Sequence, residues 1–233
     1  MIDYEILYPG AFPVVRFKLR RDERIKAESD AMVGMSPTIE VEGSLEGGLM
    51  GGLARKILTG ESFFFQNLIA KRGSGEVILG HSIPGGIMDV VMDGTESLKV
   101  QKGGFLAATE GINVGTKMQG IGKGLFSREG FFILDISGEG VVFISSYGSI
   151  HLIKLTEGEQ YIVDNGHMVA WSGNMKYSIE KASKGWISSV TSGEGFVCRF
   201  TGPGLLFIQT RAPLAFRDWC NLLGVGRGAG SRR

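Results

Sequence analysis

The stretch from Gly47 to Phe65 contains residue types that could bind a phosphate group. It reads GGLMGGLARKILTGESFFF, in which four glycines in six positions are followed by Arg55 and Lys56. A Walker-type phosphate loop also needs a serine or threonine after its Gly-Lys pair, because that hydroxyl holds the magnesium ion. Neither this stretch nor the later Gly122-Lys123-Gly124 supplies the hydroxyl. The residues therefore argue against a nucleotide site.

The spacing within the same stretch is better explained by a short helix that connects two strands. Apolar residues would share one face of this helix, with the two cations opposite them. We therefore predict a connector helix near residues 50–58. Residues of this segment are also candidates for contact with a protein partner or a membrane surface. These candidates are Leu49, Met50, Leu53, Arg55 and Lys56.

Other residues that could do chemistry form no recognisable catalytic or metal-binding motif. Three glutamates recur at similar spacing and could converge on one site, although glutamates in turns are more often solvated; they are Glu61, Glu129 and Glu194. The histidines lack the close spacing of metal ligands; they are His81, His151 and His167. Cys198 lies in a strand-like run, where a thiol is usually inert. The sequence predicts no catalytic residue, cofactor or metal, and an enzyme with an unrecognised site is the weakest alternative.

The segment from Val15 to Lys26 is the best candidate for contact with nucleic acid. It reads VRFKLRRDERIK, so basic and apolar residues alternate as they would on a half-exposed strand. Sheet-based RNA binding needs such cations beside exposed aromatic residues. The candidate contacts are Arg16, Lys18 and Arg20. Nearby acids dilute the patch, and the whole chain has a net charge of only +1, so nucleic-acid binding is an alternative and not the main prediction.

The composition indicates a cytoplasmic globular protein. Hydrophobic residues make up 43% of the 233 residues and charged residues 21%. The two cysteines, Cys198 and Cys220, are predicted to be reduced thiols. The sequence shows neither a signal peptide nor an apolar run long enough to cross a membrane. Glycine is over-represented, with 37 residues, which indicates many tight turns between short strands.

Three sequence elements recur in the same order along the chain. One is TGESFFF at Thr59, SREGFFI at Ser127 and SGEGFVC at Ser192. A second follows each copy and reads GSGEVIL at Gly73, SGEGVVFI at Ser137 and TGPGLLFI at Thr201. A third precedes each copy and reads DAMVGM at Asp30, GFLAAT at Gly104 and GHMVAW at Gly166. We therefore predict one domain over residues 1–212, made of three repeats near 1–80, 81–147 and 148–212.

The elements that would position these residues are short strands. Apolar runs of four to six residues, rich in Val, Ile and Phe, alternate with glycine-containing turns. We predict an all-β fold of three similar β-sheets or half-barrels in a pseudo-threefold arrangement. An amphipathic helix is predicted near residues 213–223, begun by Pro213 and ended by Gly224, docking on the β body or on a neighbouring subunit. Residues 224–233 are rich in Gly and Arg and are predicted to be disordered.

Several motifs together resemble a known protein family. They are GGLARKILTGESFFF, PGGI at Pro84, LKVQKGGFLAA from Leu98, VDNGHMVAW from Val163 and FTGPGLLFIQTR from Phe200. The set resembles the altered-inheritance-of-mitochondria family, whose bacterial and archaeal members are largely uncharacterised, and it covers most of residues 1–212. The resemblance implies a fold similar to the trp RNA-binding attenuation protein, whose β-sandwich units assemble into rings. It brings no catalytic residues with it.

These observations favour a non-enzymatic scaffold or binding module that forms a homo-oligomer. Exposed strand edges must be covered, and repeated units offer self-complementary surfaces. Binding of RNA or of a small ligand by an oligomeric ring is the alternative.

Overall fold

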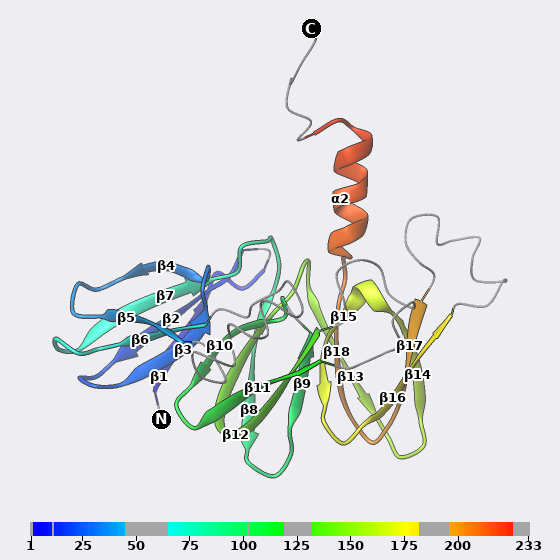
Figure 1. Ribbon diagram of the computed structural model, residues 1–233, viewed down its shortest axis with the longest axis horizontal. Coiled ribbons are helices and arrows are strands. Elements are labelled where there is room, and N and C mark those ends of the chain that lie inside the picture. The colour runs from blue at the N-terminus through cyan, green and yellow to red at the C-terminus, as the bar shows by residue number, and fades with distance from the viewer. Residues whose placement is uncertain are drawn as a thin grey trace, which may run out of the picture.

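The computed structural model describes residues 2–10, 12–44, 65–101, 103–118, 132–181 and 196–225. Almost all of this part of the chain is strand and turn, with a single α-helix near the C-terminus, so the predicted all-β class is confirmed (Figure 1). The predicted connector helix near 50–58 and its candidate contacts, Leu49, Met50, Leu53, Arg55 and Lys56, lie outside the described residues. So do the three recurring glutamates and the tail 226–233.

The described residues of the first eighty form seven strands, none of them longer than six residues. They are β1 (Asp3–Leu7), β2 (Val14–Leu19), β3 (Arg24–Glu28), β4 (Met32–Met35), β5 (Glu40–Ser44), β6 (Phe65–Ile69) and β7 (Gly75–Gly80). We call residues 1–80 segment 1.

Eleven further strands lie in the described residues between 81 and 212. Segment 2, residues 81–147, has β8 (Ile87–Asp93), β9 (Leu98–Gln101), β10 (Phe105–Thr109), β11 (Ile112–Met118) and the long β12 (Phe132–Ser145). Segment 3, residues 148–212, has β13 (Ile150–Leu155), β14 (Gln160–Asp164), the short 3-10 turn η1 (Asn165–His167), β15 (Met168–Ser172), β16 (Lys176–Lys181), β17 (Phe196–Thr201) and β18 (Gly204–Gln209).

Strand pairing follows the same scheme in each segment. In segment 1, β7 pairs with β2 and β4, and β6 pairs with β3 and β5. In segment 2, the second half of β12 pairs with β8 and β10, and its first half pairs with β9 and β11. In segment 3, β18 pairs with β13 and β15, and β17 pairs with β14 and β16. All of these pairs are antiparallel.

Even the irregularities of pairing recur. β4, β10 and β15 each carry a register shift two residues into the strand, between Met32 and Gly34, Phe105 and Ala107, and Met168 and Ala170. These shifts make Met32, Phe105 and Met168 equivalent positions. A β-bulge bends its strand and fixes where pairing continues, so the common shift fixes the correspondence between segments.

Consecutive segments are joined by one further strand pair. β10 of segment 2 pairs with β3 of segment 1, and β15 of segment 3 pairs with β9 of segment 2. The two junctions use equivalent strands and the same register, since Ala107 lies opposite Ala27 and Ala170 lies opposite Val100. We call β3, β9 and β14 the β3-type strands, and β4, β10 and β15 the β10-type strands. At each junction, the β3-type strand of one segment pairs with the β10-type strand of the segment that follows.

The segments lie in a row, with β4 at one end and β14 at the other (Figure 1). Among the described residues β4 pairs only with β7, and β14 pairs only with β17. The predicted pseudo-threefold arrangement is therefore not confirmed, because closure would require these two strands to meet. The triplication of the sequence stays a prediction.

The hydrophobic cores lie at the junctions. One core combines Phe17 and Leu68 of segment 1 with Leu106 and Phe143 of segment 2. The next core combines residues of segment 2 with Val169, Ala170 and Phe207 of segment 3. A third core consists of segment 3 residues with Ile133 from segment 2. Each of the first two cores is thus completed by side chains from the following segment.

The predicted C-terminal helix is α2 (Pro213–Leu222), with Pro213 in its first turn. Gly224 has a φ of +72°, and the backbone N–H groups of Gly224 and Val225 donate to the carbonyls of Asn221 and Cys220. This is the hydrogen-bond pattern of a Schellman cap, which ends a helix at a glycine. The start and the end of the helix were both correctly predicted.

Candidate interaction surfaces

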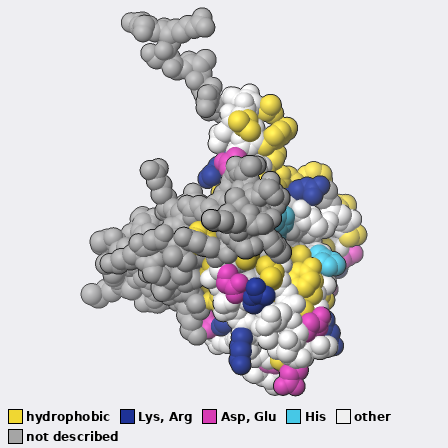
Figure 2. All heavy atoms as spheres, turned by 90° about the vertical axis from the view of Figure 1, so that its right-hand side faces the viewer, with side chains coloured by type: hydrophobic (Ala, Val, Ile, Leu, Met, Phe, Trp, Pro, Cys, Tyr) yellow, Lys and Arg dark blue, Asp and Glu magenta, His cyan; other side chains and the backbone are white. Residues whose placement is uncertain are grey.

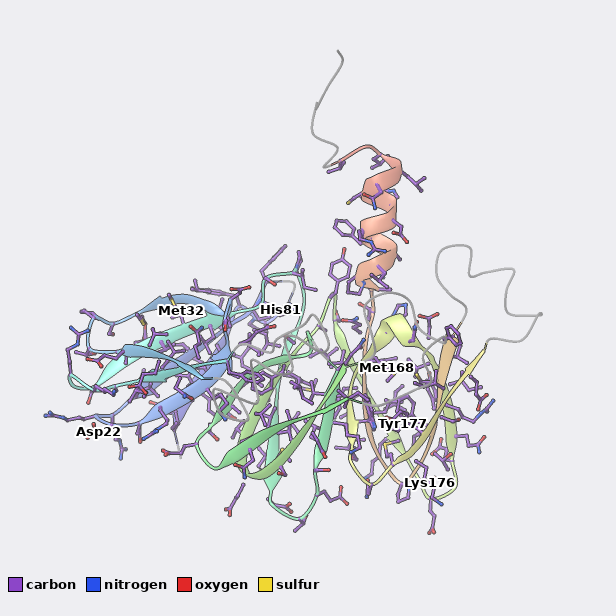
Figure 3. All side chains as sticks on the ribbon, viewed as in Figure 1. Asp22, Met32, His81, Met168, Lys176 and Tyr177 are labelled. Carbon is purple, nitrogen blue, oxygen red and sulfur yellow. The ribbon has the colours of Figure 1, made fainter. Side chains whose placement is uncertain are left out.

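The free edge of β4 exposes side chains that are buried at the equivalent positions of the other segments. Val33 is 63% exposed, whereas its equivalents Leu106 and Val169 are 0% and 1% exposed. Met32 and Met35 are exposed as well, although Met168, the equivalent of Met32, is buried. Figure 3 shows Met32 on segment 1 and Met168 within segment 3. The difference arises because β10 and β15 have a preceding segment beside them and β4 has none.

At the opposite end of the row, β14 also exposes a side chain that is buried at the equivalent positions of the other segments. Tyr161 is 41% exposed, whereas its equivalents Ile25 and Leu98 are 0% and 5% exposed. Ile25 and Leu98 lie opposite Thr109 and Ser172 of the following segment. Among the described residues, β14 pairs only with β17, and no strand of another segment lies against its other edge.

The outward face of β7 is also more exposed than the equivalent faces of β12 and β18. Phe143 and Phe207 are buried because each projects into the core of the preceding segment. Their equivalent in segment 1 is Ile78, which lies opposite Gly34 of β4 and is only half-buried. Val14 and Val33 lie beside each other next to Gly80, on the neighbouring strands. Val14, Val33 and Ile78 therefore form an apolar surface, which we call the β4 end surface.

Charged residues protect the outer strands of the described part of the chain, except β4 and most of β14. β4 has no charged residue, and β14 has only Asp164 at its last position, where the side chain accepts a hydrogen bond from Gly166 N–H at 2.9 Å. Charges lie within or at the ends of β1, β5, β8, β13 and β16, including Glu5, Glu42, Asp89, Lys154 and Glu180. Natural sheets place charges on exposed edges to prevent edge-to-edge pairing. β4 and β14 lack this protection along most of their length.

The predicted nucleic-acid strand is β2, whose apolar face is buried as expected. Val15, Phe17 and Leu19 are buried. On the opposite face, Arg16 forms ion pairs with Glu5 and Glu76, and Lys18 lies 3.9 Å from Asp3. Arg20 lies just past the strand, where its backbone N–H donates to the carboxylate of Glu23. The acids on β1 and β7 reduce the positive potential that a phosphate backbone would need.

A family model described as mitochondrial biogenesis AIM24 matches residues 4–211 of the chain. The chain belongs to this family. The match spans all three segments and both junctions between them, so the family unit is the whole row of segments. The resemblance predicted from the motifs is thereby confirmed. The predicted similarity to the trp RNA-binding attenuation protein stays a prediction.

Two relatives come from Streptococcus pyogenes. An uncharacterized protein of the serotype M6 strain is 31% identical over 206 residues, which cover 85% of this chain and 82% of that protein. A crystal structure of a Streptococcus pyogenes protein, determined by a structural genomics consortium, superposes with a TM-score of 0.79 at 28% identity. The superposition covers 96% of this chain and 100% of that chain. These AIM24 relatives support the fold and carry no stated activity.

Cys198, His167 and His81 of this AIM24 family member are described residues whose surroundings limit their reactivity. Burial, with a smaller contribution from the charge of Asp164, raises the pKa of the Cys198 thiol to about 12, so the nucleophilic thiolate is scarce at neutral pH. His167 forms a hydrogen bond of 2.7 Å between its Nδ1 atom and the backbone carbonyl of Gln209. Burial lowers the pKa of His81, which favours the neutral ring. Within the described ranges, no group of three or more His, Cys, Asp or Glu residues could hold a metal ion.

Tyr4 ties β1 of segment 1 to β8 of segment 2. Its hydroxyl donates to the Oδ2 atom of Asp89 at 2.8 Å, and burial together with this carboxylate raises the pKa of Tyr4 to about 12. Between pH 10 and 12 the unfolded chain therefore loses a proton from Tyr4 that the folded chain keeps, so stability falls as pH rises through this window. We expect Tyr4→Phe to reduce this loss. The check is the melting temperature measured at pH 8 and 11 for both proteins, and equal losses would contradict the assignment.

Helix α2 projects from the body and has no buried residue. Its apolar side chains are exposed on one half of the helix, as the space-filling view shows (Figure 2); they include Phe216, Trp219, Leu222 and Leu223. In the described part of the chain, the ring of Phe216 contacts the body at Tyr147, with 5.5 Å between centroids. The predicted docking on the β body is therefore wrong, since a 10-residue helix that extends away from the sheets cannot lay its stripe on them. Docking on a neighbouring subunit stays a prediction.

None of the helices in the described part of the chain is long and apolar enough to span a membrane. Cys198 and Cys220 are both free thiols, as the sequence predicted.

The residues at the two ends of the row were not among the predicted site residues. Val33 and Met35 fall in DAMVGM, and Tyr161 falls in the strand before GHMVAW. The signal that could have identified them is the lack of charge on β4 compared with the other outer strands. The sequence alone does not show that β4 and β14 lie at the two ends of the row of segments.

Proposed function

We propose that the protein is a non-enzymatic scaffold built from three repeats, near residues 1–80, 81–147 and 148–212, that works as a homo-oligomer. The observation that supports this most directly is the exposure of the same surfaces that are buried between segments. Among the described residues, β4 and β14 each have one edge without a paired strand and carry no charge over most of their length, and their equivalents form both junctions inside the chain. A repeat architecture with such ends needs either a cap or a neighbour.

The free thiols of Cys198 and Cys220 are in keeping with a reducing compartment such as the cytoplasm. RNA binding by a ring is the alternative. It is less favoured because Arg16 and Lys18 lie against acids.

The test is the mass of the native protein and of one edge variant. We expect light scattering after size exclusion to give a multiple of 25.1 kDa for the native chain. We expect Val33→Lys to give about one chain mass, because a lysine on this surface would be buried without a partner on assembly.

A matched control is available on β8. Val91 is 71% exposed, and its equivalents in the other segments are Lys18 and Lys154. Val91→Lys should therefore leave the mass unchanged. A native mass of 25.1 kDa would refute the oligomer, and a 260 nm absorbance that co-elutes with the purified protein would favour the RNA alternative.

A further inference from the structure

We infer that β4 of one copy pairs with β14 of a second copy, so that molecules join head to tail and extend the row of segments. The partner is a second copy of this chain. This inference rests on the proposed homo-oligomer and specifies the surface and the register through which it forms.

The two junctions inside the chain provide the template. At both, the β10-type strand of the following segment pairs antiparallel with the β3-type strand of the preceding one. In strand order β4 is the β10-type strand of segment 1, and β14 is the β3-type strand of segment 3. These are the two members of such a pair that stay unpaired among the described residues.

The register follows from the equivalent residues. Ala107 lies opposite Ala27 and Ala170 lies opposite Val100, and the corresponding residues of β4 and β14 are Gly34 and Val163. The spacing to the following bulged strand supports this assignment, because Ala27, Val100 and Val163 each precede the first residue of that strand by five positions. The predicted intermolecular pairs are therefore Gly34 with Val163, Met35 with Ile162 and Ser36 with Tyr161.

The composition of the hydrophobic cores supports the same pairing as the strand edges. The core of segment 1 receives Leu106 and Phe143 from segment 2, and the core of segment 2 receives Val169 and Phe207 from segment 3. The core of segment 3 receives no equivalent pair among the described residues. Val33 and Ile78 are equivalent to the pairs Leu106 with Phe143 and Val169 with Phe207, and they lie on the β4 end surface. A second copy would bring them onto segment 3.

β4 and β14 of one molecule do not pair with each other, because they lie at opposite ends of the row (Figure 1). Pairing of β4 with another β4 would bring two β10-type strands together, which neither internal junction does. The contact is therefore heterologous, and it produces a ring if the rotation between copies closes or a filament if it does not.

The experiment introduces cysteines at one predicted pair. The double variant Met35→Cys with Ile162→Cys is made in a Cys220→Ser background, and Cys198 stays because it is buried. Residues directly opposite each other in antiparallel strands have Cα atoms about 4.5–5.5 Å apart, within the range that a disulfide spans. We expect oxidation to give a ladder of covalent species at multiples of 25.1 kDa on a non-reducing gel.

Three controls decide the outcome. Met35→Cys with Tyr161→Cys should give no ladder, because a shift of one residue places the two side chains on opposite faces of the sheet. Each single cysteine variant should stay monomeric on the gel. A covalent dimer from Met35→Cys alone would show a symmetric contact and overturn the inference.

The failures of the two proposals can be told apart. A native protein that is oligomeric by light scattering but gives no ladder from the double variant would overturn the β4–β14 pairing and leave the scaffold standing. A native mass of 25.1 kDa would overturn both.

Discussion

Phe143→Ala is expected to lower the free energy of unfolding by about 3–5 kcal/mol, the range for removing a buried aromatic ring. Phe143 is fully buried on β12 of segment 2 and belongs to the core that this segment shares with segment 1. Its ring meets Tyr4 and Phe17 edge to face, at 4.9 and 5.0 Å between centroids. Such pairs add to the free energy of area burial. The substitution therefore leaves a cavity at the junction between two segments.

The effect should reach the whole molecule, because each core is shared. The three tryptophans, Trp171, Trp186 and Trp219, all lie in the last third of the chain, whereas far-ultraviolet circular dichroism reports on every strand. We expect both signals to unfold together and both to shift in the variant. The melting temperature should fall by roughly 10 °C for a domain of this size.

Val91→Ala is the matched control for this substitution. It also truncates a strand side chain of segment 2, but one that is 71% exposed, so the change should stay within about 0.5 kcal/mol. If the tryptophan signal of Phe143→Ala still changed at the melting temperature of the native protein, the segments would unfold separately. That result would contradict the shared-core interpretation.

Local sequence patterns predicted the local structure of this chain well. The alternation of VRFKLR gave the buried and exposed faces of β2, with Phe17 inside and Lys18 outside. Pro213 and Gly224 marked the limits of α2, because their backbone preferences act over one turn of helix. These predictions depend only on residues close in sequence.

Relations between distant residues could not be predicted in this way. Val33, Leu106 and Val169 are similar residues in similar strands, yet one is exposed and two are buried. The difference depends on whether a segment precedes each strand in space, which no window of sequence contains. The same reason explains the wrong prediction for α2: its stripe was correct, but its direction away from the body depends on the path of the chain after β18.

The second recurring sequence element contains a G-x-G pattern in each segment. The glycine pairs Gly73–Gly75, Gly138–Gly140 and Gly202–Gly204 precede or begin β7, the second half of β12, and β18. In segment 2 the two halves of β12 run on as one strand, so the glycines mark the point where its partners change from β9 and β11 to β8 and β10. At Gly138 and Gly202 a neighbouring backbone carbonyl oxygen lies too close to leave room for a side chain.

Gly138→Ala should therefore destabilise the protein by at least about 2 kcal/mol, since a strained backbone conformation costs about 1–3 kcal/mol before any clash. Gly138 has a φ of +108°, which side-chain-bearing residues rarely adopt, and a methyl group would overlap the carbonyl oxygen of Gly111. Relief would require β11 to move away from β12, which breaks their pairing near Ile112. Gly43→Ala on β5 is the matched control, because nothing lies within 4 Å of its added carbon. Denaturant unfolding of both variants is the measurement, and equal stability would show that the close approach at Gly138 does not constrain the fold.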